Sequence, residues 1–367
     1  MKITRVTLFQ VPISFAGTSY RLSGGRSYES LDSTIVQIHT DRDVVGWGEI
    51  CPWGRNYLPE FAEAARAALA VLAPDLIGLD PCNPAAVNNA MDRLLQGHIY
   101  AKAAVDIACW DILGKHAGLP VHALLGGRRA EAIPLLSSLY HGPVDDMLMR
   151  IEASRAQGVK SFSAKAGGQA HTDIEQFWEI GRNRRSDETF IADANGGWSV
   201  PAALQVLAAI DELGFFFEQP CAGMAECGRV RSKVRSPFIL DESAISADDL
   251  THIVKTDAAD ALHFKISRVG GITKARRFRD FCEVAGISSF WEASGGSAIA
   301  DAAAAHVAIS APVGAPHKFW SCQEYNAEPL CAGGPVIKDG MMTLGDQPGL
   351  GVEPLPEVVR SPAASFA

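Results

Sequence analysis

The sequence lacks three features that mark other classes of protein. No stretch reaches the 18 uninterrupted apolar residues that a membrane-spanning helix requires. It contains no Walker or GxGxxG pattern, so nothing in it predicts a nucleotide-binding loop. Basic residues are few: 33 Lys and Arg stand against 42 Asp and Glu, and the net charge is −9. This balance disfavours nucleic acid or an anionic membrane as a partner.

Paired cysteines are also missing. The eight cysteines form no CxxC pair, which is a common spacing in zinc and redox sites. In a chain of 367 residues they are typical of reduced, buried thiols, and we expect a cytoplasmic protein. At the N-terminus, Lys2 and Arg5 precede apolar residues, but Gln10, Pro12 and Ser14 interrupt that run. We therefore expect a β-strand there rather than a signal peptide.

Residues 1–128 are expected to form an α+β capping domain. Apolar and polar residues alternate over 3–9 and 33–40, which predicts antiparallel strands. Predicted helices follow at 59–72, 84–95 and 100–117. The intervening segment 16–30, here called the lid, is rich in Gly, Ser, Tyr and Arg, a composition that we expect to contribute nothing to a core. It suits a mobile lid over a site, or a disordered surface loop.

From residue 129 the pattern changes to alternating strands and helices, which predicts a modified TIM barrel, (β/α)7β, over 129–325. The eighth strand is expected to end near Glu324, and residues 326–367 to pack back on the capping domain. Helices are predicted near 145–156, 173–184, 200–213, 247–254, 272–285 and 297–310.

Seven functional residues each close a short apolar run, at intervals of 28, 25, 23, 24, 27 and 28 positions. Each interval is about the length of one βα unit, so these residues are predicted at the C-terminal ends of successive strands, where barrels carry their chemistry. They are Lys165, Asp193, Glu218, Asp241, Lys265, Glu292 and Trp320.

Three acids on successive strand ends predict a metal site. Hard carboxylate oxygens from Asp193, Glu218 and Asp241 suit Mg²⁺. Each acid could instead cap the helix that follows it. Glu242 is an alternative to Asp241, but strand alternation is expected to direct it away from the barrel mouth.

Two lysines flank these acids, and Lys165 and Lys265 are expected to face a bound substrate from opposite sides. An ammonium that is partly desolvated and near other cations loses its proton more easily, as a general base must. The alternative is that both lysines form salt bridges with acids at the barrel mouth.

These motifs together resemble the enolase superfamily, in its muconate-lactonizing-enzyme-like subgroup. The segment 104–127 is similar to the signature helix beside the barrel, and the ligand motifs are matched by Asp193 with Asn195 and Trp198, by Glu218-Gln219-Pro220 and by Asp241-Glu242-Ser243. Lys265 matches the lysine that ends the sixth strand. The resemblance implies an enzyme that binds Mg²⁺ and removes the α-proton of a carboxylate substrate.

One departure bears on the substrate. The family pattern Lys-x-Lys at the second strand is here Ser163-Ala164-Lys165. The lysine that is usually the base is kept as Lys165, whereas Ser163 replaces the lysine that usually assists it or contacts the substrate. The departure suggests a specialised substrate.

The last two strand ends suggest which substrate. Glu292 and Trp320 could hold a cation by charge pairing and cation–π contact, or could be a salt bridge and plain packing. Trp53, Asn56 and Tyr57 of the capping domain could complete an aromatic wall. An ammonium beside a metal-bound carboxylate describes an α-amino acid.

Within the superfamily, this layout is similar to enzymes acting on proline betaine and hydroxyproline, with Asn195 and Ser163 as further substrate contacts. The resemblance implies dehydration of cis-3-hydroxy-L-proline to Δ1-pyrroline-2-carboxylate by a hydro-lyase. Alternatives are 2-epimerisation of proline derivatives and a non-catalytic barrel that binds an amino acid. We expect a small-molecule substrate and a homo-oligomer.

Overall fold

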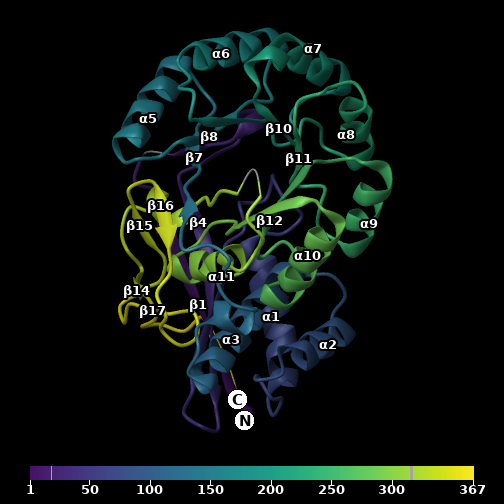
Figure 1. Ribbon diagram of the computed structural model, residues 1–367. Helices are drawn as coiled ribbons and strands as arrows, with labels where there is room; N and C mark the ends of the chain where they lie inside the picture. The colour runs from purple at the N-terminus through teal and green to yellow at the C-terminus, as the bar shows by residue number, and fades with distance from the viewer. Residues whose placement is uncertain (18, 315–316) are drawn as a thin grey trace.

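The computed structural model describes residues 1–17, 19–314 and 317–367. Thr18, within the predicted lid, lies outside the described residues. An antiparallel sheet with three helices lies at one end of the molecule, and a barrel ringed by helices lies at the other (Figure 1). Within the described residues, no helix combines the length and apolar character needed to cross a bilayer.

The capping part is built on a four-stranded antiparallel sheet in the order β18-β1-β4-β5. Its strands are β1 (Ile3–Ser14), β4 (Ser30–Thr40), β5 (Val45–Ile50) and β18 (Ala364–Phe366). Its helices are α1 (Ala62–Leu76), α2 (Pro84–Leu94) and α3 (Ile99–Ala117). The predicted antiparallel strands are thus confirmed, and the last residues of the chain add an edge strand beside β1.

Helix α3 is buried along most of its length because glycines of β5 let it approach closely. A Cβ placed on Gly48 would lie only 1.9 Å from the main-chain oxygen of Ala104, so no other residue fits there. The helix ends as predicted at Gly118, whose φ of 67° lies in the left-handed region that glycine adopts without strain.

The barrel contains seven parallel strands in sequential order, and the predicted fold class is confirmed. The strands are β7 (Ser137–Leu139), β8 (Ser161–Lys165), β9 (Thr189–Asp193), β10 (Phe216–Glu218), β11 (Phe238–Leu240), β12 (Ala261–Lys265) and β13 (Ser288–Glu292). Short apolar runs such as Phe238–Leu240 are fully buried, as expected for strands covered on both faces.

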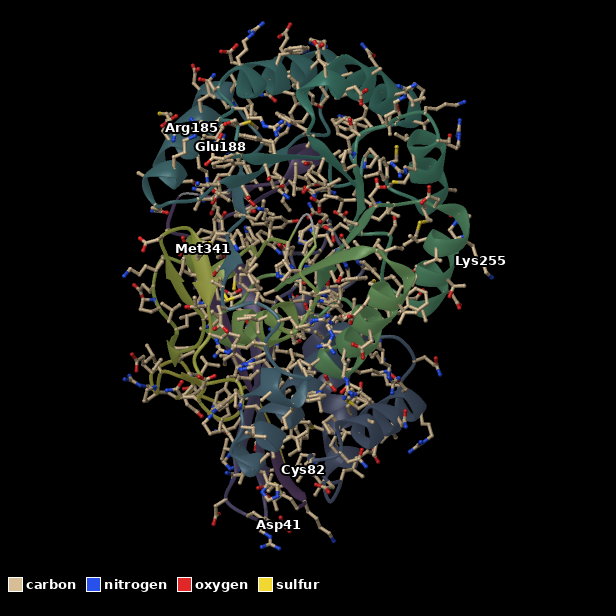
Figure 2. The ribbon with its side chains drawn as sticks, in the orientation of Figure 1. Asp41, Cys82, Arg185, Glu188, Lys255 and Met341 are labelled. Atoms are coloured by element: carbon tan, nitrogen blue, oxygen red, sulfur yellow. The ribbon has the colours of Figure 1, made fainter. Side chains whose placement is uncertain are left out.

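Helices surround these strands (Figure 1). They are α4 (Val121–Leu124), α5 (Val144–Ala156), α6 (Ala170–Arg182), α7 (Val200–Ile210), α8 (Met224–Arg231), α9 (Ala247–Thr256), α10 (Ile272–Ala285) and α11 (Ala298–Ile309). Helix α8 is not predicted by the sequence pattern, because its eight residues include a glycine and only two buried side chains. Figure 2 shows Lys255 of α9 directed away from the barrel and Asp41 at the far tip of the capping sheet.

The predicted eighth strand ending near Glu324 is wrong. Phe319 makes one parallel bridge, to Leu135, and a 3-10 helix η3 (Cys322–Tyr325) follows. The chain turns there because the buried carboxylate of Asp301 accepts the backbone N–H groups of Cys322 and Gln323, which a strand would use for pairing.

The remaining elements are short. They are β2 (Tyr20–Arg21), η1 (Ser23–Gly25), β3 (Ser27–Tyr28), β6 (Ile133–Pro134), η2 (Asp211–Leu213), β14 (Cys331–Gly333), β15 (Val336–Lys338), β16 (Met341–Thr343) and β17 (Val352–Pro354). The extended segment before α5 is divided, because β6 pairs with β16 and only β7 joins the barrel.

The lid folds as the β2–β3 hairpin with η1 at its tip. The expectation that its composition contributes nothing to a core is wrong for Tyr20 and Leu22, which are 3% and 5% exposed. Both side chains line the cavity at the barrel mouth, so the lid covers the place where the strand ends meet.

Candidate active site

One cavity at the barrel mouth collects most of the residues singled out from the sequence. It is lined by Ser163, Lys165, Asn195, Asp241, Lys265, Glu292 and Trp320 from the barrel, and by Trp53 and Tyr57 from the capping part. The other two predicted residues, Asp193 and Glu218, lie beside each other at the ends of β9 and β10. The regular spacing in the sequence therefore corresponds to one shared location.

The two lysines are held by carboxylates. Lys165 Nζ donates a hydrogen bond to Asp193 Oδ2. Lys265 Nζ lies 2.6 Å from Glu292 Oε1 and 3.2 Å from Asp241 Oδ2. Salt bridges, the alternative considered for the lysines, are therefore present in the structure.

The expectation that these lysines lose their protons easily is wrong for this arrangement. Burial lowers the pKa of each ammonium, but the negative charges of Asp193 at Lys165, and of Asp241 and Glu292 at Lys265, outweigh burial. The pKa of each lysine is raised because acids surround it, where the prediction assumed cations.

Buried acids form the centre of the site. Glu218, Asp241 and His263 each place one possible ligand atom within 4.8 Å of the other two, the one such group among the described residues. Asp193, predicted as a ligand beside Glu218 and Asp241, is not in this group. Burial and the neighbouring charge of Asp193 raise the pKa of Glu218, and its Oε2 is buried without a hydrogen-bond partner. A buried carboxylate oxygen without a partner lowers the stability of the folded protein unless a cation or a hydrogen-bond donor binds it.

His263 was missed in the sequence, although it lies two positions before Lys265 and so on the same face of β12. Its Nδ1 lies 2.6 Å from Glu218 Oε1, and its Nε2 lies 2.6 Å from Glu292 Oε2. Burial lowers its pKa, but the charges of Glu292 and Glu218 more than compensate and bring the pKa to about 9. Nδ1 is thus occupied by Glu218, and Nε2 lies between Glu292 and Lys265 Nζ, which is 3.3 Å away, so both nitrogens are engaged and His263 is a poor metal ligand.

Arg268 was also missed, because it lies in the turn after β12, where strand periodicity gives no signal. Its side chain is buried and donates hydrogen bonds to the main-chain oxygen and the carboxylate of Asp241. Burial raises the pKa of Asp241, but the charges of Arg268 and Lys265 outweigh it and hold the pKa below its usual range.

Glu242 does not point away from the mouth as strand alternation predicted. Strand β11 ends at Leu240, so alternation no longer governs the two acids that follow. Glu242 Oε1 accepts hydrogen bonds from Tyr57 and, at 3.2 Å, from Asn195 Nδ2. Tyr57 and Asn195 line the cavity, but the Tyr57 hydroxyl binds this carboxylate, and Asn195 Nδ2 donates to both Glu242 and Asp193.

Aromatic rings form one wall of the cavity. Trp320 lies 6.4 Å from Trp53 and 6.2 Å from Tyr20 between ring centroids, and it stacks on Tyr325 at 5.1 Å. Of the residues predicted to complete this wall, Trp53 lies beside Trp320, and Tyr20 of the lid joins them. Asn56, in contrast, accepts a hydrogen bond from Tyr28 and is exposed.

Two family descriptions match the chain. Residues 21–126 match the N-terminal domain of the mandelate racemase/muconate lactonizing enzyme family, and residues 146–358 match the enolase C-terminal domain-like family.

Three similar proteins align with nearly the whole length of this chain. A cis-3-hydroxy-L-proline dehydratase from Roseibium aggregatum is 38% identical over 100% of both chains. An N-succinyl-L-Arg/Lys racemase from Bacillus cereus is 29% identical over 96% of this chain and 95% of its own. A crystal structure of an enolase superfamily member from Roseovarius nubinhibens, complexed with magnesium, is 38% identical with a TM-score of 0.93 over 100% of this chain and 99% of its own.

Proposed function

The chain belongs to the mandelate racemase/muconate lactonizing enzyme family of the enolase superfamily, and from this premise we propose that it dehydrates cis-3-hydroxy-L-proline to Δ1-pyrroline-2-carboxylate. The observation that carries the proposal is the meeting of Lys165, Lys265 and buried carboxylates in one cavity closed by an aromatic wall. The full-length similarity to a cis-3-hydroxy-L-proline dehydratase supports the choice of substrate.

We assign Asp193, Glu218 and Asp241 as the residues that would hold Mg²⁺. The partnerless Glu218 Oε2 fits this assignment, because a divalent cation would satisfy a buried oxygen that no described donor reaches. When bound, Mg²⁺ would supply Lewis acidity at the substrate carboxylate, which lowers the cost of removing the neighbouring α-proton.

The two lysines divide the proton transfers. One lysine takes the proton from C2 of the substrate, and the C3–O bond breaks as a protonated lysine donates to the departing hydroxyl, which leaves as water. The resulting enamine takes up a proton at C3, loses the proton on its ring nitrogen and so becomes the imine. Lys165 ends β8 and Lys265 ends β12, so one amine can act as the base while the other acts as the acid.

The ring nitrogen is assigned to Glu292 and Trp320, which line the cavity together. A charged amine is attracted by a carboxylate and by the face of an indole ring. Ser163, also on the lining, leaves space where a lysine would place a second positive charge.

Epimerisation at C2 is the second candidate, because Lys165 and Lys265 reach the cavity from β8 and β12, and a proton removed by one could be returned by the other. A substrate without a leaving group at C3 would follow this course. The similarity to a racemase from Bacillus cereus agrees with it.

Proton NMR in D₂O with Mg²⁺ separates the two functions. We expect cis-3-hydroxy-L-proline to be converted to the imine, and L-proline betaine to show no deuterium at C2. Deuterium in both enantiomers of the betaine, with no imine from the hydroxyproline, would favour epimerisation. If neither compound changes, both candidates fail. Lys165→Met and Lys265→Met serve as controls and should each lower kcat by about 100-fold or more.

A further inference from the structure

The lid contacts the barrel mouth through the hydroxyl of Ser23. This serine lies in η1 at the tip of the lid and is fully buried, with 0% exposure. Its Oγ lies 3.1 Å from Asn195 Oδ1 and 3.4 Å from the main-chain oxygen of Asp193. The hydroxyl therefore donates to the segment that follows β9.

The barrel provides a close-fitting position for this side chain. Gly167 has a φ of +97°, and a Cβ built on it would lie 3.3 Å from Ser23 Cβ and 2.7 Å from the main-chain oxygen of Ala194. Only glycine fits at residue 167, and only a small residue fits opposite it. The lid tip is thus packed against the barrel and is not merely laid over it.

Asn195 connects Ser23 to Asp193 through hydrogen bonds. Its backbone N–H donates to Asp193 Oδ1 at 2.9 Å, and its side-chain Nδ2 donates to Asp193 Oδ2 at 3.1 Å. Asn195 therefore contacts both carboxylate oxygens, and Lys165 Nζ also donates to Oδ2. The hydrogen bond from Ser23 fixes the Oδ1 end of the Asn195 amide, so that its nitrogen faces Asp193.

Arg26 makes a second connection between the lid and the same residue. Its Nη2 lies 3.3 Å from the main-chain oxygen of Asn195, and its guanidinium lies 4.9 Å from the centre of the Tyr57 ring. Asn195 adopts a φ of 44°, in the left-handed region where asparagine is tolerated but uncommon. Lid contacts on both its side chain and its backbone stabilise this conformation.

We propose that Ser23 is a positioning residue, which orients Asn195 when the lid is docked and thereby sets the carboxylate of Asp193 for a divalent cation. The inference rests on the proposed function in one respect, the assignment of Asp193 as a ligand of the cation. Because the coupling is reciprocal, cation binding at the strand ends also favours the docked lid.

The test compares two serines of the same lid, Ser23→Ala and Ser27→Ala. Ser27 is exposed and serves as the matched control. Isothermal titration calorimetry measures Mg²⁺ binding to protein freed of divalent cations. We expect Ser23→Ala to weaken Mg²⁺ binding about fivefold, the effect of losing one buried hydrogen bond, and Ser27→Ala to match the wild type.

Limited proteolysis of the lid supplies a second readout. Mg²⁺ should protect the lid in the wild type and in Ser27→Ala, and should protect it less in Ser23→Ala. Ser23→Gly, which removes the same hydroxyl, should repeat the result of Ser23→Ala. Equal Mg²⁺ affinities and equal protection in Ser23→Ala and Ser27→Ala would overturn the inference.

The two proposals fail separately. A wild-type protein that binds Mg²⁺ but transforms no cyclic amino acid would refute the proposed function, while the comparison of the two serine variants would still decide the role of Ser23. An active wild-type enzyme with unchanged Mg²⁺ binding in Ser23→Ala would refute only the inference.

Discussion

At the residue scale, the site is a chain of buried, charged side chains in contact. Glu218, His263, Glu292, Lys265 and Asp241 follow one another through contacts of 2.6 to 3.2 Å. Opposite charges alternate along this sequence, so each compensates the desolvation of its neighbour. When one charged side chain is removed, its partners stay buried without an opposite charge. The resulting loss of stability is larger than the net stabilisation that the intact pair provides.

His263→Leu tests this network. The substitution removes the hydrogen bond to Glu218 Oε1 and the positive charge beside Glu292 Oε2, and we expect the free energy of unfolding to fall by about 3 kcal/mol. Urea denaturation followed by circular dichroism measures the change. His263→Gln retains one donor and should lose less. Equal stability of His263→Leu and the wild type would contradict the network.

Asp106 predicts a pH dependence of stability outside the cavity. Burial raises its pKa to about 6, despite hydrogen bonds from Thr273 and Asn88. Between its unfolded pKa of 3.8 and about 6, the folded chain keeps a proton that the unfolded chain releases, so stability falls as pH rises.

Asp106→Asn removes this titration. We expect the free energy of unfolding of the wild type, relative to that of Asp106→Asn, to fall by about 3 kcal/mol between pH 3.5 and pH 7. Chemical denaturation of both proteins at several pH values gives this difference. A difference that stays constant, or that grows with pH, would show that Asp106 does not titrate in this way.

At the element scale, carboxylates of the capping part cap the N-termini of two barrel helices. Glu49 of β5 accepts hydrogen bonds from the backbone N–H groups of Ser297 and Ala300 at the start of α11, and from the Ser297 hydroxyl. Asp106 of α3 accepts the backbone N–H of Thr273 at the start of α10. A carboxylate at a helix N-terminus satisfies free N–H groups and interacts favourably with the helix dipole.

Glu49→Ala should therefore lower the free energy of unfolding by about 2–3 kcal/mol, because several buried donors lose their acceptor at once. Ser246→Ala is the matched comparison, since Ser246 caps α9 within its own helix and at a more accessible position. Its expected cost is about 1 kcal/mol. Thermal denaturation of both variants shows which substitution destabilises the protein more. If Glu49→Ala destabilises it no more than Ser246→Ala does, the capping role is contradicted.

At the scale of the whole molecule, the capping part and the barrel share a core. One hydrophobic cluster contains Phe9 and Trp47 of the capping sheet together with Phe162 and Phe290 of barrel strands. The two ends of the chain lie close together at the base of the capping sheet, where β18 pairs with β1 (Figure 1). The lid and the aromatic wall therefore sit on a support that is continuous with the barrel.

The sequence predicts the parts of this architecture that repeat. The period of the βα units locates five strand ends, at Lys165, Asp193, Glu218, Lys265 and Glu292, and it places Asp241 one residue beyond a sixth. His263 could have been found as well, because it shares a strand face with Lys265. The turn residue Arg268 and the position of Glu242 follow no period.

Contacts between distant segments account for the remainder. Glu49 and Ser297 are 248 positions apart, and Ser23 and Asn195 are 172 apart. An acid within a strand of the capping sheet gives no indication of the helix that it caps, and a serine in a glycine-rich lid gives none of the asparagine that it contacts. Such pairings depend on how the two parts dock, which local sequence patterns do not encode.

The most direct test of the proposed chemistry is the loss of the α-proton of cis-3-hydroxy-L-proline, followed by proton NMR, before and after divalent cations are removed. We predict that wild-type protein treated with EDTA forms no imine, that added Mg²⁺ restores imine formation, and that Lys265→Met stays inactive with Mg²⁺ present. Imine formation that persists without divalent cations, or in Lys265→Met at the wild-type rate, would contradict the account.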